Sequence, residues 1–235
     1  MKISLVIPAH NEEDVITNTI VEIEQTLTLD YEIIVVNDNS LDRTKAIIHD
    51  LMKRYRNLRL IDNDGEKGFA NALRIGFAEA RSDLIIPVMA DLCDDPKAIL
   101  DMVREAPRFD IVCGSRYTKG GVKKGGPLLQ SFFSRFVGRS LKYLIRIPTS
   151  DVSNSFKCYR RKVLDTIKTK SSGFDLSMEI TLKAYFHGFS ITEVPTVWSG
   201  RSMGKSKFYL FKAAPAYVRL YLWAILQKGL KKCAK

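Results

Sequence analysis

Apolar and polar positions follow a regular order along the first 115 residues, with short apolar runs separated by longer mixed segments. The runs are rich in β-branched residues and lie at 3–8, 31–36, 58–61, 83–89 and 110–115. This length and composition are typical of strands covered on both faces. The segments between them, 12–27, 41–55, 68–81 and 96–106, place apolar residues at helical spacing, and Asn11 is the expected cap of the first helix. Repeated strand–helix units predict a doubly wound, mostly parallel sheet flanked by helices.

Three of the predicted strands end in a cluster of acidic and small polar residues. These clusters are IPAHNEE at 7–13, VVNDNSLDRT at 35–44 and PVMADLCDDP at 87–96. Right-handed crossovers bring the carboxyl ends of parallel strands to one edge of a sheet, which is where open α/β sheets bind ligands. Acidic side chains gathered at that edge indicate a divalent cation together with a phosphorylated, hydroxyl-rich ligand.

The alternation of strands and helices breaks after residue 116. The glycine- and lysine-rich stretch TKGGVKKGGP at 118–127 predicts a loop that an anionic ligand would order. Beyond it we expect a helix near 128–146, a polar segment DVSNSFKCYR at 151–160, a helix near 174–187, a strand at 191–195 and a second basic loop at 199–207. This part of the chain is expected to complete the sheet.

The segment 208–235 is the most apolar long stretch, but Lys212, Pro215 and Arg219 interrupt it. A charge near the middle of a spanning helix is costly, so a transmembrane helix is disfavoured. Lys205, Lys212 and Arg219 recur every seven residues and fall on one helical stripe. That pattern predicts an amphipathic helix lying in a membrane interface, or alternatively a helix packed on its own domain or on a second subunit.

The chain has 235 residues, 46% of them apolar, which is enough for one sizeable core. Its net charge of +11 suits nucleic acid, an anionic membrane surface or an anionic substrate. Because no nucleic-acid-binding module accompanies the charge, we predict no nucleic-acid partner. The four cysteines show no CxxC spacing and no signal peptide is visible, so we expect a reduced protein that faces the cytoplasm.

A series of motifs in this chain resembles the family 2 glycosyltransferases with the GT-A fold, and within them the dolichyl-phosphate mannose synthase and polyprenyl-phosphate glycosyltransferase branch. The motifs are IPAHNEE (7–13), VVNDNSLDRT (35–44), EKGFANALRIGF (66–77), ADLCDDP (90–96), GSRYTKGG (114–121), DVSNSFKCYRR (151–161), EVP (193–195) and the RSMGKSK stretch (201–207). The resemblance implies a catalytic domain over 1–207, with a nucleotide-sugar half at 1–115 and an acceptor half at 116–207. Residues 208–235 would then form an interfacial or packing helix and a basic tail.

The resemblance also implies an activity and a set of site residues. A hexose would pass from a UDP- or GDP-sugar to a polyprenyl phosphate of the dolichyl type, with inversion at the anomeric carbon and with Mg²⁺ or Mn²⁺ as cofactor. Residues matching nucleotide-sugar contacts are Pro8, His10, Glu12, Asp38, Lys67 and Asp91, and Asp91 also matches the metal ligand. Residues matching acceptor-phosphate contacts are Arg116, Ser134, Arg201 and Lys207, and we expect Asp91, Arg116 and Arg201 to be the catalytic residues.

Several positions depart from the family pattern. His10 stands where Tyr or Phe is usual, Asn37 where Asp is common and Ala70 where Gly is common. The DxD motif has lost its first acid, because the chain reads Met89-Ala90-Asp91. Cys93 replaces a Gln that often assists the metal, and Gln130 stands where mannose synthases carry Arg. These changes affect the residues expected to set metal affinity and sugar identity.

Acceptor chemistry separates the alternatives. A phosphate monoester is mostly dianionic at neutral pH and needs cations, whereas an alcohol needs a base to take its proton. The basic residues of the second half therefore favour a lipid-phosphate acceptor. Together with the C-terminal helix, this acceptor predicts a peripheral enzyme on the cytoplasmic side of a membrane. The sequence leaves open whether the chain forms a homo-oligomer or binds a membrane partner subunit. The alternatives are a family 2 transferase acting on a saccharide hydroxyl, with Asp151 or Glu179 as base, and a non-catalytic nucleotide-sugar-binding subunit.

Overall fold

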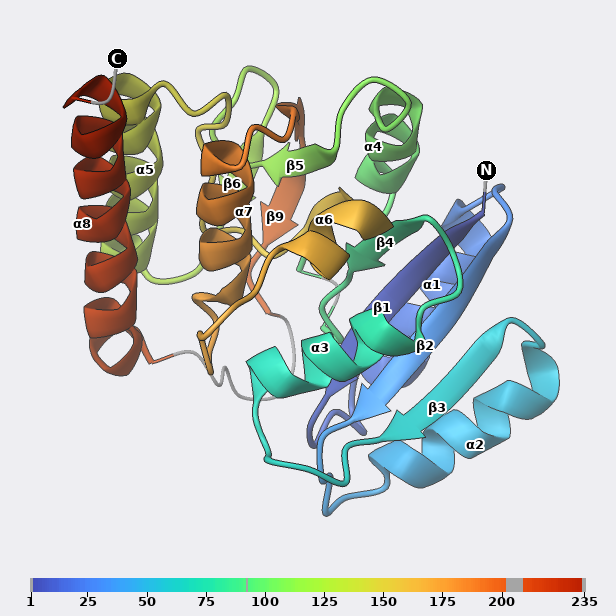
Figure 1. Cartoon of the computed structure of the whole chain (residues 1–235). Coiled ribbons are helices and arrows are strands. Elements are labelled where there is room, and N and C mark those ends of the chain that lie inside the picture. The colour runs from blue at the N-terminus through green and yellow to red at the C-terminus, as the bar shows by residue number, and fades with distance from the viewer. Residues whose placement is uncertain (1, 92, 202–208, 234–235) are drawn as a thin grey trace.

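The computed structural model describes residues 2–91, 93–201 and 209–233, and it is built around one large sheet (Figure 1). The strands of this sheet, in chain order, are β1 Ile3–Ala9, β2 Tyr31–Asn37, β3 Leu58–Asp62, β4 Leu84–Pro87, β5 Ile111–Ser115, β7 Lys157–Arg160 and β8 Ile191–Pro195. Their order across the sheet is β3-β2-β1-β4-β7-β5-β8. The doubly wound, mostly parallel sheet predicted from the sequence is confirmed.

β7 is the exception to the parallel arrangement. It runs antiparallel to both neighbours, pairing Ile85 with Tyr159 on one side and Val112 with Cys158 on the other. The sequence suggested only a polar segment over 151–160, because the KCYR strand is short and half of its residues are basic. A strand from the second half of the chain therefore lies between β4 and β5 of the first half.

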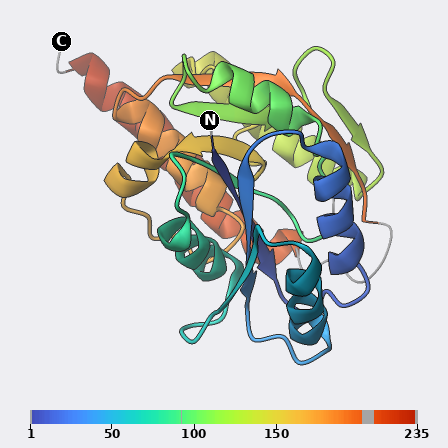
Figure 2. The same ribbon diagram turned by 90° about the vertical axis from the view of Figure 1, so that its right-hand side faces the viewer.

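Helices cover both faces of the sheet (Figure 2). They are α1 Ile16–Thr26, α2 Thr44–Arg54, α3 Phe69–Glu79, α4 Ala98–Glu105, α5 Leu128–Ile145, α6 Arg161–Thr166, α7 Leu176–Phe186 and α8 Leu210–Cys233. Side chains of α1, α2 and α4 share one buried apolar cluster with alternate residues of β1 and β2, such as Leu5 and Ile33. Side chains of α3, α6 and α7 pack on the opposite face against the intervening residues, such as Val6 and Ile34. This alternation follows from the two-residue period of a strand.

A close approach fixes the position of α3. A Cβ atom at Gly76 would lie 2.2 Å from the Cγ1 atom of Val6, so only glycine lets the helix pack this near to β1. α3 begins directly after the loop that carries Lys67 and Gly68. The close packing therefore holds that loop at the carboxyl edge of the sheet.

A second, two-stranded sheet includes residues that the sequence predicts as a loop. β6 (Val122–Lys124) pairs in parallel with β9 (Val197–Ser199). The expectation of a loop over 118–127 is therefore wrong for the β6 residues. Pairing with a strand some seventy residues later satisfies backbone groups that the local sequence, rich in glycine, could not satisfy alone.

The C-terminal helix α8 packs on the same molecule. Leu220 and Ala224 are buried against Leu141 of α5 and Leu182 of α7, and the helices lie side by side in Figure 1. Other apolar side chains of α8 are exposed, among them Phe211, Leu222, Leu226 and Leu230. Within 2–91, 93–201 and 209–233, every helix falls short of the combination of length and apolarity that a bilayer crossing needs.

Asn11 does not cap α1, contrary to expectation. The helix begins only at Ile16, and Asn11 adopts a positive φ of 51°. Its Oδ1 atom accepts a hydrogen bond of 2.8 Å from the backbone N–H of Leu41. Asn11 thus joins the loops that follow β1 and β2, and residues 10–13 remain at the sheet edge instead of entering the helix.

Candidate active site

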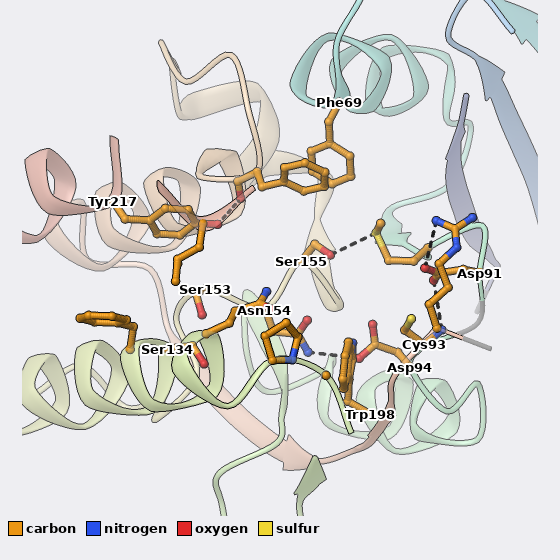
Figure 3. A pocket seen from close by; sticks show the side chains of 18 of the residues that line it. Phe69, Asp91, Cys93, Asp94, Ser134, Ser153, Asn154, Ser155, Trp198 and Tyr217 are labelled. Atoms are coloured by element: carbon orange, nitrogen blue, oxygen red, sulfur yellow. Dashed lines mark hydrogen bonds and ion pairs between the residues drawn. The ribbon is translucent and has the colours of Figure 1, made fainter. Parts of the chain in front are cut away.

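A cavity of about 1100 Å³ opens at the carboxyl edge of the sheet. Residues from each of the acidic clusters predicted at the strand ends line it, including Pro8, Asp38 and Asp91. The cavity extends from there past the end of β5 to the space between α5 and α8, and Figure 3 shows the side chains around its centre. The expectation that these strand ends converge is confirmed.

The predicted nucleotide-sugar residues Pro8, His10, Glu12, Asp38 and Lys67 all line the cavity. The Nδ1 atom of His10 lies 2.8 Å from the backbone oxygen of Asp38, and a carbonyl can only accept, so this ring nitrogen carries the proton. The carboxylate of Asp38 accepts hydrogen bonds from Asn63 Nδ2 at 2.7 Å and from the backbone N–H of Gly68. These contacts fix the orientation of both side chains toward a ligand.

Asn63 did not figure in the sequence prediction. It is buried, and its side chain donates to the backbone oxygen of Glu66 as well as to Asp38. It therefore connects the end of β3 to the loop before α3. An Asn after a strand gives little local signal of such a role, because its partners come from elsewhere in the chain.

Two predicted donor contacts and one predicted acceptor contact lie together in one cluster. The guanidinium of Arg201 pairs with the carboxylate of Glu12 and lies 3.6 Å from Asp91 Oδ2. All three side chains are mostly buried, and Figure 3 marks the pairing with Asp91. Arg201, assigned to an acceptor phosphate from the sequence, is thus positioned against the donor-side carboxylates.

The two neighbours of Asp91 in the motif offer no hard metal ligand. Met89 accepts a contact from the hydroxyl of Ser155, whose Oγ lies 3.6 Å from the sulfur. Burial and the nearby charge of Asp91 raise the pKa of the Cys93 thiol far above its usual range, so the thiol stays protonated at neutral pH. Among the residues that the structure describes, no three His, Cys, Asp or Glu side chains gather as ligands of one metal ion.

Arg116 forms a buried ion pair with Asp151. Its Nε atom lies 2.7 Å from Asp151 Oδ2 and its Nη2 atom 2.8 Å from Oδ1, and the two side chains are 8% and 0% exposed. A Cβ atom at Gly138 of α5 would lie 2.0 Å from the backbone oxygen of Ser150. Glycine at this position lets α5 press on the segment that carries Asp151.

Asp94 lies beside this pair. Burial raises its pKa to about 7, against the opposing charge of Arg116 and a hydrogen bond from Asn154. The Nδ2 atom of Asn154 lies 3.3 Å from Asp94 Oδ1 and 3.0 Å from the backbone oxygen of Gly114. Asp94 and Asn154 both line the cavity, so a group that titrates near neutrality lies at its wall.

Neither carboxylate suggested as a base for an alcohol acceptor lines the cavity. Asp151 is engaged by Arg116, as described above. Glu179 is buried, accepts hydrogen bonds from the backbone N–H groups of Lys170 and Ser171, and pairs with Lys183 at 2.7 Å. Both side chains serve the fold, which removes the main support for a saccharide-hydroxyl acceptor.

The remaining predicted phosphate contacts are Ser134 and Lys207. Ser134 of α5 lines the cavity next to Gln130, and its hydroxyl makes a close hydrogen bond with that of Tyr117. Lys207 lies outside the described residues, as does Lys205 of the basic stripe. Arg116 and Ser134 therefore reach the same cavity from β5 and α5.

The cavity has two parts, which we call the polar arm, at the ends of β1, β2 and β4, and the apolar arm, between α5 and α8. The sequence did not predict the apolar arm. Its walls are side chains of α5 and α8, namely Phe133, Phe136, Val137, Leu210, Phe211, Ala214, Val218, Tyr221 and Leu222. Phe69 and Phe174 also line the cavity, and their rings stack with centroids 4.3 Å apart. The hydroxyl of Tyr217 donates to the backbone oxygen of Phe174 at 2.9 Å and ties α8 to this part of the wall.

The chain is similar to known sugar-transferring proteins over most of its length. The family model described as Glycosyl transferase family 2 matches residues 4–168. A dolichol-phosphate mannosyltransferase of Pyrococcus furiosus is 32% identical over 231 residues, which are 95% of this chain and 64% of that protein. A polyprenol monophosphomannose synthase of Mycolicibacterium smegmatis is 25% identical over 94% of this chain and 86% of its own length. The chain thus spans slightly less than two thirds of the Pyrococcus protein.

Solved structures show the same fold at lower identity. Glucosyl-3-phosphoglycerate synthase of Mycobacterium tuberculosis, in complex with Mn²⁺, UDP and glucosyl-3-phosphoglycerate, superposes with a TM-score of 0.70 at 17% identity, covering 97% of this chain and 79% of the other. Staphylococcus aureus TarS with UDP-GlcNAc gives a TM-score of 0.68 at 20% identity, covering 96% of this chain and 67% of the other. At these identities the likeness establishes the architecture alone.

Proposed function

The chain belongs to glycosyl transferase family 2, and from this premise we propose that it transfers a hexose from a UDP- or GDP-sugar to a polyprenyl phosphate. Relatives named for dolichol-phosphate and polyprenol-phosphate mannosyl transfer support the reaction class. The phosphate oxygen of the acceptor would attack the anomeric carbon opposite the departing nucleoside diphosphate, and the configuration there would invert.

The change of polarity along the cavity supports a polyprenyl phosphate as the acceptor. The cavity is polar where it meets β1, β2 and β4 and apolar where it runs between α5 and α8, with Arg116 and Ser134 at the transition. A nucleotide-sugar suits the polar arm, a phosphate suits the guanidinium and hydroxyl, and a prenyl chain suits the apolar arm. A phosphate monoester also needs no base, which agrees with the structural engagement of Asp151 and Glu179.

A divalent cation, Mg²⁺ or Mn²⁺, is part of this proposal. Such ions keep several waters and use one or two carboxylates with substrate phosphates, and Asp91 with Glu12 beside it meets that need. The pairing of Arg201 with both carboxylates is evidence that a positive charge is accommodated there. Asp91 would hold the cation, which when bound would neutralise charge on the departing diphosphate; Met89 and Cys93 would not contribute.

We also propose that the apolar arm receives its prenyl chain from a membrane surface. Exposed aromatic and aliphatic side chains lie on both helices that form the arm, Phe132 and Phe136 on α5 and Phe211, Val218 and Leu222 on α8. Exposed Lys212 and Arg219 of α8 would favour anionic lipid. This arrangement allows α8 to pack on its own domain by one face and to meet lipid by another.

A donor and acceptor screen tests the function. Purified protein with Mn²⁺ is incubated with a panel of UDP- and GDP-hexoses, each with and without a polyprenyl phosphate, and nucleoside diphosphate release is measured. We expect release of one nucleoside diphosphate that depends on the lipid, together with a glycosylated lipid product. Release that is equal without lipid, or transfer only to a saccharide, would contradict the proposal.

A further inference from the structure

Lys123 of β6 holds a buried ammonium group without an acceptor. Its Nζ atom is buried and has no hydrogen-bond partner among the residues that the structure describes. The ammonium makes a cation–π contact with the ring of Trp198 on β9, whose centroid lies 4.8 Å from Nζ. An ammonium group in water donates three hydrogen bonds, so this environment is costly for the charged side chain.

The ammonium is nevertheless charged at neutral pH. Burial, together with the like charge of Arg116, lowers the pKa of Lys123 to about 8, and Asp151 opposes the shift. A lysine that served only to fill space would be replaced by an apolar residue at a gain in stability, because an unpaired buried charge is strongly unfavourable. The charge therefore needs another explanation.

The charges around Lys123 do not balance. Lys123 and Lys157 each lie within range of the like charge of Arg116 and of the opposite charge of Asp151. Arg116 takes up Asp151 through two parallel contacts. Lys157 is satisfied by the backbone oxygen of Val152 and the hydroxyl of Ser177. Asp94, with a pKa of about 7, is only partly ionised at neutral pH, so the cluster has an excess of positive charge and Lys123 is its member without a partner.

The cover over Lys123 is a wall of the cavity. Trp198 and Gly126 both line it, as do Arg116 and Ser134. A Cβ atom at Gly126 would lie 3.0 Å from the indole ring of Trp198 and 3.7 Å from Cε of Lys123. The indole ring thus packs against a glycine of the cavity wall, and the ammonium of Lys123, which is not itself a lining residue, lies over that ring.

We propose that Lys123 is a further phosphate-binding residue of this protein, whose ammonium contacts a phosphate monoester that enters beside Arg116 and Ser134. Reorientation of the Trp198 ring opens the path between the ammonium and the phosphate. The anion supplies both the missing acceptor and the missing negative charge. The inference rests on the proposed function for the identity of the acceptor, but the chemistry that it requires is only a phosphate monoester.

Binding is tested first without donor or catalysis. The chain has two tryptophans, so Trp223→Phe leaves Trp198 as the single fluorescent indole. A short-chain polyprenyl phosphate in detergent, 3-phosphoglycerate and inorganic phosphate are titrated separately. We expect a saturable change in Trp198 emission with at least one of the three compounds. When the protein also carries Lys123→Met, we expect the affinity for that compound to fall at least tenfold. The three titrations also show whether the phosphate belongs to a lipid, to a soluble ester or to the free ion.

Two controls separate binding from structure. Lys124→Met, at an exposed neighbour on the same strand, is expected to bind as the parent does. Lys123→Met is expected to raise the denaturant midpoint, because it removes an unpaired buried charge, whereas a purely structural cation–π role predicts a lower midpoint. No response to any phosphate compound, or equal affinity of Lys123→Met and parent, would overturn the inference.

Transfer kinetics then distinguish the two proposals. If the wild type transfers sugar to polyprenyl phosphate, Lys123→Met is expected to raise the KM for that acceptor tenfold or more and to leave the KM for the donor within twofold. An unchanged acceptor KM would reject the role of Lys123 alone. If the wild type transfers nothing to polyprenyl phosphate but Trp198 still responds to a phosphate monoester through Lys123, the proposed acceptor fails and the phosphate site stands.

Discussion

Arg201 is a single side chain with two competing sets of partners. The motif match assigns it to a phosphate, whereas its guanidinium pairs with Glu12 and lies 3.6 Å from Asp91. A divalent cation and a guanidinium cannot both occupy the space beside these carboxylates, because like charges at such short range repel strongly. If a cation binds at Asp91 as proposed, Arg201 would have to leave this carboxylate, and the departing diphosphate would offer it another partner.

Arg201→Gln should separate these interactions. We expect kcat/KM to fall about 30- to 1000-fold, equivalent to roughly 2–4 kcal/mol, because a charge-assisted contact to phosphate is lost. We expect Mn²⁺ binding without nucleotide, measured by electron paramagnetic resonance, to become tighter, because Asp91 and Glu12 are released. Arg104→Gln, at an exposed pair with Asp101, is the control; weaker Mn²⁺ binding by Arg201→Gln would argue against the competition.

Arg116→Ala should act on stability as well as on catalysis. It leaves Asp151, which is 0% exposed, without its cation, and breaking a buried pair by removing one partner costs about 3–5 kcal/mol. Chemical denaturation should show this loss, and replacing both partners together with Leu should recover part of it. If Arg116→Ala unfolds at the wild-type denaturant concentration, the pair is not part of the folded core.

Asp94→Asn should change the pH dependence of stability. Because the pKa of Asp94 is raised from 3.8 to about 7 by burial, the folded state keeps a proton that the unfolded state loses between about pH 4 and 7. The free energy of unfolding of the wild type should therefore fall across this range. Asp94→Asn should avoid this fall and gain on the order of 2–4 kcal/mol over the wild type between pH 4 and 8. As a control, Asp64→Asn changes an exposed carboxylate, and its free energy of unfolding should follow the same pH dependence as that of the wild type.

The motif residues show how far the sequence determines the site. Asp38, Asp91 and Arg116 were identified from motifs that resemble those of the family, and they do line one cavity. Their partners were not found: Asn63 on Asp38, or Arg201 on Asp91. Such partners are set by the packing of segments far apart in the chain, which no local pattern records.

At the scale of elements, α8 has two apolar faces with different roles. Leu220 and Ala224 bury one face against α5 and α7, while Leu222, Leu226 and Leu230 are more than half exposed at 53%, 66% and 64%. The sequence offered packing and interfacial helices as alternatives, and the structure demonstrates the packing. The exposed face is the part that the membrane proposal concerns.

Substitutions on the two faces should affect different properties, membrane binding for the exposed face and stability for the buried face. Leu226→Glu is expected to weaken binding to phosphatidylglycerol-containing vesicles, measured by co-sedimentation, and to leave stability unchanged. Leu220→Ala is expected to cost about 2–4 kcal/mol of stability through the cavity it leaves. Leu41→Glu, at a 91% exposed site far along the chain, controls for the added charge; equal loss of vesicle binding in both Glu variants would remove α8 as the contact.

For the strands, as for the site, the sequence pattern does not reveal contacts between segments that lie far apart in the chain. Runs such as 3–8 and 31–36 were identified from their apolar, β-branched residues, and the structure buries them on both faces. β7 was not, since Lys157 and Arg160 make its sequence look exposed. Lys157 is in fact fully buried, with its ammonium bonded to Val152 and Ser177, so tertiary contacts override the local pattern there.

At the scale of the whole molecule, the cavity joins a polar arm from the first half of the chain to an apolar arm formed by α5 and α8 of the second half. The polar arm is lined by residues such as Pro8 and Asp38, and the apolar arm by residues such as Val218 and Leu222. Donor and acceptor would therefore meet only in the complete fold. Neither half of the chain alone could bind both the donor and the acceptor.

The length of the prenyl chain should set acceptor affinity until the apolar arm is filled. Each added isoprene unit buries further apolar surface, which corresponds to about tenfold or more in KM for each unit that enters the arm. A series of phosphates from one to six isoprene units should therefore show a falling KM followed by a plateau. A KM independent of chain length would mean that the arm does not hold the lipid.

The antiparallel strand β7 has a consequence for how the protein is made. β4 ends at Pro87 and β5 at Ser115, but β7, which joins them, ends only at Arg160. A ribosome adding 5–20 residues per second needs roughly 4–15 s to extend the chain from β4 to the end of β7. During that time the edge of β4 on a nascent chain has no partner, and chaperone binding or slow translation in this interval would decide how much of the protein escapes aggregation.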